Sequence, residues 1–260
     1  MEYLLVCSVA LFVSGLTLFS GFGLGTLLMP AFALFFPLPV AIAATAVVHL
    51  ANNLFKVALV GRAADWGVVA RFALPGALAA IVGAATLRFF ADLPPLFHYA
   101  LGSTLHAIAP LKLVIGLLIV GFALLELLPG RTALAFGRRF LIPGGLLSGF
   151  FGGLSGNQGA FRAAFLLRAG LSKEGFVATG TVAAVIVDCA RLLVYGQGFY
   201  AKTFTGAAAL GPLVGAATVA AFLGALVGRR LLKKMTLATL HRLVGTLLVM
   251  VGLGLASGLI

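Results

Sequence analysis

Two glycine-rich segments carry the residue types most suited to chemistry in this chain. The longer one runs from Ser148 to Gly159 and places two amides, Asn157 and Gln158, after a series of glycines. An earlier segment, Ser20 to Gly25, repeats its glycine pattern. Inside a bilayer an unpaired backbone group costs several kcal/mol, so a broken helix is tolerated only where it faces protein or a watery cavity. These breaks therefore indicate a binding site.

The chemistry expected at such a break is anion binding. Free N–H groups at the start of a helix carry partial positive charge and attract anions. We expect Gly153 through Gln158 to open a half-helix that points toward the middle of the membrane. A simpler interpretation is that the glycines only let helices pack closely, which explains Gly152 and Gly156 but not two adjacent amides at membrane depth. The candidate contacts from both segments are Gly23, Gly25, Gly153, Ser155, Gly156, Asn157 and Gln158.

Three cations within apolar segments are candidate partners for an anion. Lys56 and Arg191 are costly inside a span, and a desolvated oxyanion needs positive charge nearby. Both lie about one turn from a span end, so they could instead snorkel to the interface. Arg162 follows Gln158 by four positions on one helix face, and it could equally pair with a lipid phosphate.

Polar residues that precede these cations could add specificity or couple transport to protons. Asn52 and Asn53 are further candidate substrate contacts, and His49 shares a helix face with Asn53. His49 could carry a proton, or it could simply bond a neighbouring helix. Asp188 stands one turn before Arg191, where it could neutralise the arginine or, when protonated, release it. No metal or cofactor is expected.

The elements that hold these residues are membrane helices. The 260 residues are 62% hydrophobic and 9% charged, against about 45–50% and 25% in soluble domains, and the mean hydropathy is +1.18. The net charge of +12 lies in short connections, as topology signals do, so nucleic acid is not expected as a partner. The start of the chain lacks the features of a signal peptide and is expected to begin the first membrane segment.

A span needs about 20 apolar residues, and this length divides the chain into two similar cycles. The expected spans lie near residues 40–60, 68–88, 110–128, 173–195, 204–228 and 237–259, with broken stretches at 4–36 and 140–170. Asn53 and Lys56 each lie 135 positions before Asp188 and Arg191. The sequence therefore predicts a repeat in residues 1–128 and 140–260, joined by a cytoplasmic linker at 129–139.

Charge sets the expected orientation, because lysine and arginine gather in cytoplasmic connections. The central linker carries three arginines, and the last connection is also basic: Arg131, Arg138 and Arg139, then Arg229, Arg230, Lys233, Lys234 and Arg242. When the spans are counted from these two connections, both ends of 140–170 lie inside and both ends of 4–36 lie outside. We therefore expect an all-α polytopic membrane protein with an inverted repeat, each half a broken or re-entrant helical hairpin plus three transmembrane helices. Two thin tilted spans would give the same topology.

The chain resembles the sulfite exporter TauE/SafE family. The resemblance rests on Gly21 to Gly25, Pro30, the Pro37 to Pro39 turn, Ala43 to Thr45, and the second glycine-rich copy followed by Ala178 and Thr179. It implies transport of sulfite or short organosulfonates such as sulfoacetate in the bacterial inner membrane. The second copy continues with Asn157 and Gln158 where the first has apolar residues, so two equivalent half-sites are not expected.

The combined expectation is a secondary transporter that exports small sulfur oxyanions by alternating access and is coupled to protons through His49 or Asp188. An uncoupled anion channel of the same fold is the alternative, and its flux would not saturate. An enzyme is not expected, because the chain carries no motif with clustered acid and base groups. The stretch from Phe89 to Ala109 is expected to be an outer interfacial helix or lid. Oligomeric state stays open.

Overall fold

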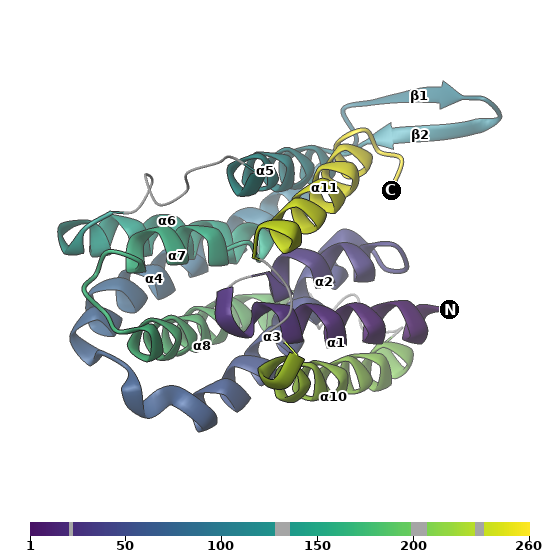
Figure 1. The fold of residues 1–260 in the computed structure, drawn as a ribbon. Coiled ribbons are helices and arrows are strands. Elements are labelled where there is room, and N and C mark those ends of the chain that lie inside the picture. The colour runs from purple at the N-terminus through teal and green to yellow at the C-terminus, as the bar shows by residue number, and fades with distance from the viewer. Residues whose placement is uncertain (21–22, 128–135, 199–206, 232–236) are drawn as a thin grey trace.

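The computed structural model describes residues 1–20, 23–127, 136–198, 207–231 and 237–260. In this part of the chain the fold is a bundle of helices with one small hairpin of strands at its end (Figure 1). The first half contains α1 (Glu2–Ser20), α2 (Leu24–Ala33), α3 (Leu38–Val60), α4 (Trp66–Ala91), β1 (Phe97–Leu101), β2 (Thr104–Ile108) and α5 (Pro110–Leu127). The second half contains α6 (Leu141–Ser155), α7 (Gly159–Leu166), α8 (Lys173–Gly198), α10 (Ala207–Leu231) and α11 (Leu237–Ala256).

The helices match the expected membrane segments. Within the described residues, four stretches are long and apolar enough to cross a bilayer: 38–63, 66–91, 173–197 and 210–228. The other two predicted spans correspond to α5 and α11, which contain shorter apolar helices. The prediction of a helical membrane protein is confirmed.

The second broken stretch forms a hairpin of two unequal helices. α6 has 15 residues and α7 has 8, so they rise about 22 Å and 12 Å. The start and the end of the hairpin lie together, because Gly137 pairs with Arg168 and Arg138 donates to the carbonyl of Ala169 across 2.7 Å. The stretch therefore returns to the end of the bundle at which it began.

Connections expected on the cytoplasmic side meet at that same end. Arg138 contacts Asp65, the N-cap of α4, across 3.1 Å. The backbone N–H of Asp65 in turn donates to the hydroxyl of Thr179 near the start of α8. The turn before α4, the start of α8 and both ends of the hairpin therefore lie at one end of the bundle. That this end faces the cytoplasm stays a prediction.

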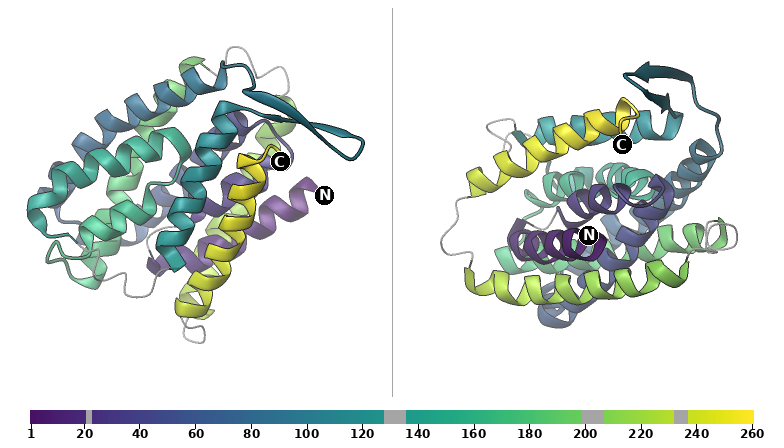
Figure 2. Two further views of the ribbon diagram at one scale, coloured as in Figure 1. Left: turned by 90° about the horizontal axis from the view of Figure 1, so that it is seen from above. Right: turned by 90° about the vertical axis from the view of Figure 1, so that its right-hand side faces the viewer.

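Glycines let pairs of helices from different halves approach closely. A Cβ on Gly149 of α6 would lie 1.9 Å from the carbonyl oxygen of Gly76 on α4. A Cβ on Gly224 of α10 would lie 2.0 Å from the carbonyl of Leu11 on α1. α4 therefore packs along α6, and α1 packs along α10, with almost no side chain between their backbones. α5 packs along α11 and α3 along α8, as the two views in Figure 2 show for the α5–α11 pair.

The expected interfacial helix between Phe89 and Ala109 is wrong, whereas the alternative of a lid stays a prediction. α4 ends at Ala91, Pro94 and Pro95 follow, and the chain then forms the antiparallel hairpin of β1 and β2 around Gly102. Gly102 has φ +62°, which favours glycine, and short alternating segments favour strands over a helix. The hairpin projects beyond the bundle and contacts the C-terminal end through Tyr99, which donates to the carbonyl of Ser257 across 2.6 Å (Figure 2).

Some expectations fall on residues that the structure does not describe. These are Gly21 and Phe22 of the first break, most of the predicted linker including Arg131, and the side chains of the last basic connection. The division into residues 1–128, 129–139 and 140–260 stays a prediction.

Candidate functional site

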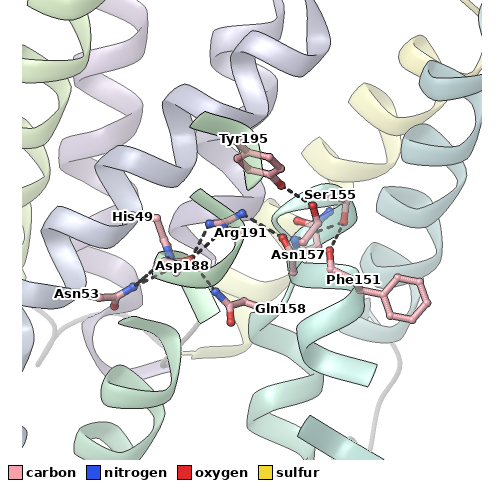
Figure 3. A network of polar contacts seen from close by, with 11 residues as sticks. His49, Asn53, Phe151, Ser155, Asn157, Gln158, Asp188, Arg191 and Tyr195 are labelled. Atoms are coloured by element: carbon pink, nitrogen blue, oxygen red, sulfur yellow. Dashed lines mark hydrogen bonds and ion pairs between the residues drawn. The ribbon is translucent and has the colours of Figure 1, made fainter. Parts of the chain in front are cut away.

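The carboxylate of Asp188 is the centre of a buried polar network (Figure 3). The residue has 0% exposure. Its Oδ1 accepts from Gln158 Nε2 at 2.9 Å and from Arg191 Nε at 3.0 Å. Its Oδ2 accepts from His49 Nδ1 at 2.6 Å and from Asn53 Nδ2 at 3.5 Å. So many donors stabilise the ionised carboxylate, which would otherwise be costly to bury.

Three elements bring these donors together. His49 and Asn53 lie one turn apart on α3, so they share a face, and that face packs against α8. Asp188 and Arg191 lie one turn apart on α8. Gln158 comes from the break between α6 and α7. Its backbone carbonyl accepts from the hydroxyl of Ser148 across 2.9 Å.

Arg191 joins the carboxylate to the end of α6. Its Nη2 lies 2.7 Å from Asp188 Oδ1, and its Nη1 donates to the carbonyl of Gly152 across 3.1 Å. Tyr195, one turn further along α8, donates to the carbonyl of Gly153. Cations and donors are favoured at the C-terminal carbonyls of a helix. With 0% exposure, Arg191 faces the interior and does not snorkel.

The two glycine-rich breaks meet beside this network. Gly156 has φ +79° and ends α6, and a Cβ on it would lie 3.1 Å from Arg191 Nη1. A Cβ on Gly25, in the first turn of α2, would lie 3.1 Å from the carbonyl oxygen of Gly156 and 3.6 Å from His49 Cδ2. Gly23 precedes α2 with φ 120°. A Cβ on Gly156 would therefore press on Arg191, and a Cβ on Gly25 would press on the backbone of Gly156, so both positions favour glycine.

The second break is narrower than expected. Gly153 does not open the second half-helix, because α6 continues to Ser155 and α7 starts at Gly159. A Cβ on Gly153 would lie 2.1 Å from the carbonyl of Ala80, so this glycine serves the close packing of α6 against α4. The hydroxyl of Ser155 donates to the carbonyl of Phe151 across 3.0 Å and accepts from the N–H of Asn157 at 3.4 Å. Ser155 thus shapes the break instead of offering a free hydroxyl.

Several buried polar atoms near the breaks have no hydrogen-bond partner among the described residues. They are both amide atoms of Asn157, Nδ2 of Asn52, Oγ1 of Thr45 and Nη2 of Arg191, the last held only by its charge contact with Asp188. Asn157 is 3% exposed and Asn52 is 0% exposed. Buried donors are normally satisfied, so these amides are suited to bind the oxygens of a ligand.

Two further cations lie in the same interior. Lys56 is 6% exposed and Arg162 is 4% exposed, so neither reaches the lipid surface as a snorkelling side chain would. Arg162 passes beside Gly180 of α8, where a Cβ would lie 3.6 Å from its Nε. The charges of Lys56 and Arg162 lie close enough to repel each other. Both charges increase the attraction of the interior for an anion.

Sequence reasoning missed Tyr195, Ser148 and Ser14. Ser14 on α1 donates to Asn52 Oδ1 across 3.1 Å. Tyr195 could have been found, because it follows Arg191 by four positions and so lies on the same face. Thr179, one of the residues on which the family resemblance rests, accepts from the backbone N–H of Asp65 through its hydroxyl. No group of three His, Cys, Asp or Glu suited to a metal occurs in the described part of the chain.

The fold and the site define a helical, multi-pass membrane protein with a buried, positively charged polar centre. The chain belongs to the Sulfite exporter TauE/SafE family, whose profile matches residues 3–255. It is therefore a member of a family of membrane transporters. No curated protein and no solved structure matches the chain.

Proposed function

We propose that the protein exports small sulfur oxyanions, sulfite or short organosulfonates such as sulfoacetate, across the bacterial cytoplasmic membrane. The observation that carries this proposal is the buried centre itself. Three cations, Lys56, Arg162 and Arg191, share one interior with the carboxylate of Asp188 and with unsatisfied amide groups. Buried positive charge beside free donors attracts an anion and selects for oxygen acceptors. That the anion is a sulfur oxyanion is inferred from the family, which is named for sulfite export.

The anion would bind where the two breaks meet. The unsatisfied amide of Asn157, Nη2 of Arg191 and the amide of Asn52 would donate to its oxygens. Asp188 would hold Arg191 in position through the bonds to its Nε and Nη2. Gly25 and Gly156 would leave room for the ligand, because a Cβ on Gly156 would press on Arg191 and a Cβ on Gly25 would press on the carbonyl oxygen of Gly156.

Transport would proceed by alternating access within an inverted repeat. Exchanging α1 with α6, α3 with α8, α4 with α10 and α5 with α11 maps the most extensively packed pairs of helices onto one another. The α4–α6 pair becomes the α10–α1 pair, and the α3–α8 and α5–α11 pairs map onto themselves. Asn53 and Asp188, which occupy matching positions, lie 3.5 Å apart. Such a contact supports an axis of pseudo-symmetry through the site, where transporters of this build bind substrate.

The His49–Asp188 pair would couple export to protons. Protonation of Asp188 would weaken its hold on Arg191 and leave that guanidinium to the anion. The buried imidazole of His49 contacts Oδ2 of Asp188, the oxygen that Arg191 does not contact, and could pass the proton to the carboxylate.

The test is flux of labelled sulfite and sulfoacetate through liposomes that contain the purified protein, with and without a pH gradient. We expect saturable flux that Arg191→Ala abolishes, whereas Arg71→Ala, an exposed arginine on α4, leaves it unchanged. Flux linear in substrate concentration would favour an uncoupled channel over a transporter. Absence of flux for every sulfur anion would reject the substrate assignment.

A further inference from the structure

The two central helices carry matching pairs of polar residues with different charge. In α8, Asp188 is followed three positions later by Arg191, and in α3, Asn53 is followed three positions later by Lys56. Asn53 Nδ2 lies 3.5 Å from Asp188 Oδ2, so the matching positions touch. The first half thus has a neutral amide at the position where the second half has a carboxylate.

Because of this difference, Arg191 has a carboxylate partner and Lys56 has none among the residues that the structure describes. Arg191 Nη2 lies 2.7 Å from Asp188 Oδ1, which neutralises it. Lys56 is 6% exposed, and no hydrogen bond or ion pair reaches it from the residues that the structure describes. Its charged neighbour is Arg162, which is also positive. Burying an isolated ammonium costs free energy, and a negatively charged partner beside Lys56 would offset that cost.

The remaining carboxylates whose side chains the structure describes do not supply that partner from the interior. The chain has six acidic residues, and Asp188 is the only buried one among those whose side chains are described. Asp65 and Asp92 flank the ends of α4, Glu2 and Glu174 lie in the first turns of α1 and α8, and Glu126 lies in the last turn of α5. Arg162 keeps its charge whatever it bonds, because a guanidinium is not deprotonated in proteins. The interior therefore holds more positive than negative charge.

We propose that the site selects doubly charged anions, with Lys56 as the residue that pairs with the second negative charge. This inference rests on the proposed anion transport and deepens it. Arg191 and the amide of Asn157 bind one anionic group at the breaks. Lys56, two turns beyond His49 on the same face of α3, binds the other group toward the end of α3 that leads to Arg62. A monoanion leaves Lys56 without a partner and binds less tightly.

The experiment compares two ligands of nearly equal shape that differ by one charge. Sulfoacetate carries a sulfonate and a carboxylate, and sulfoacetamide replaces the carboxylate with a neutral amide. Half-saturation concentrations are measured for both in proteoliposomes at neutral pH, for the wild type, Lys56→Gln and Lys56→Met. Lys173→Gln, the same change at an exposed lysine, is the matched control.

In the wild type and in Lys173→Gln, sulfoacetate should bind about tenfold or more tightly than sulfoacetamide, because desolvated charge pairs are strong. Lys56→Gln should remove that preference by weakening sulfoacetate alone. Lys56→Met should also remove it, because methionine keeps a side chain of similar length without the charge.

Equal affinity of the wild type for both ligands would overturn the inference. An equal loss of affinity for both ligands in Lys56→Gln would overturn it as well. In either case anion transport itself would stand. If neither ligand nor sulfite is transported by the wild type, the proposed function fails first. Fluorescence-detected size exclusion of each variant shows whether it folds, and Lys56→Met, whose apolar side chain suits a buried position, keeps the test valid if Lys56→Gln does not fold.

Discussion

His49 Nδ1 donates to Asp188 Oδ2 across 2.6 Å and so joins α3 of the first half to α8 of the second. The other oxygen of the same carboxylate accepts from Gln158 and Arg191. One buried carboxylate thus connects both central helices and the break that follows α6. Any change in its charge alters the hydrogen bonds of all three elements. Asp188 is therefore the most informative residue to alter.

Asp188→Asn should abolish transport and destabilise the protein. The substitution keeps the shape of the side chain but leaves the buried guanidinium of Arg191 without a negative partner. Breaking a buried ion pair in this way costs about 3–5 kcal/mol. Thermal unfolding in detergent and sulfite flux in liposomes measure the two effects.

Asp92→Asn is the matched control, because Asp92 is exposed at the end of α4 and should tolerate the change. The double variant Asp188→Asn/Arg191→Gln should recover part of the stability, since no unpaired charge remains, but not the transport. An Asp188→Asn protein with normal melting temperature and normal flux would show that the carboxylate does not organise the site.

His49→Asn should uncouple transport from protons while leaving the site assembled. The amide Nδ2 of asparagine can replace imidazole Nδ1 as the donor to Asp188, but an amide does not titrate. We therefore expect uptake of sulfite without a pH gradient to persist and its acceleration by a gradient to disappear. His98→Asn, at an exposed histidine of β1, should keep the acceleration. A gradient response that survives in His49→Asn would assign coupling to another group.

Gly156→Ala and Gly170→Ala form a matched pair that separates backbone strain from damage to the site. Their φ angles are +79° and +71°, so alanine should cost roughly 1–2 kcal/mol at either position. Only at Gly156 does the new Cβ reach Arg191, at 3.1 Å from Nη1, whereas at Gly170 it meets nothing within 4 Å. Both variants should lose similar stability, but only Gly156→Ala should reduce the affinity for the anion, by about tenfold. Similar half-saturation in the two variants would contradict a role of Gly156 at the site.

The membrane helices could be predicted because their signals are local. Apolar length marks the spans, whereas the side of the membrane on which the ends near Asp65, Arg138 and Thr179 lie stays a prediction from the basic connections. The strands between Phe97 and Ile108 were missed, because only five-residue segments alternate there and a short apolar run is ambiguous.

Helical spacing also predicted half of the site. Asp188 with Arg191 and His49 with Asn53 follow from positions three and four apart on a helix. The bond from His49 to Asp188 does not follow, because no local pattern shows which faces of α3 and α8 meet. Burial of Lys56 was equally hidden, since a lysine one turn from a span end can snorkel or face inward. Cys189 is exposed on α8, and its apolar segment likewise does not show which way it faces.

Gly149→Ala should destabilise the protein through packing alone. Its Cβ would lie 1.9 Å from the carbonyl oxygen of Gly76, so α6 and α4 would have to separate. Overpacking of this kind costs about 1–3 kcal/mol. Gly121→Ala on α5 is the matched control, because nothing lies within 4 Å of the new Cβ and alanine favours a helix over glycine by about 0.5–1 kcal/mol. Thermal unfolding of both variants in the same detergent should give a lower melting temperature for Gly149→Ala and an equal or higher one for Gly121→Ala. Equal melting temperatures would mean that the close approach of α4 and α6 contributes little to stability, and that the glycines of α6 are needed for another reason.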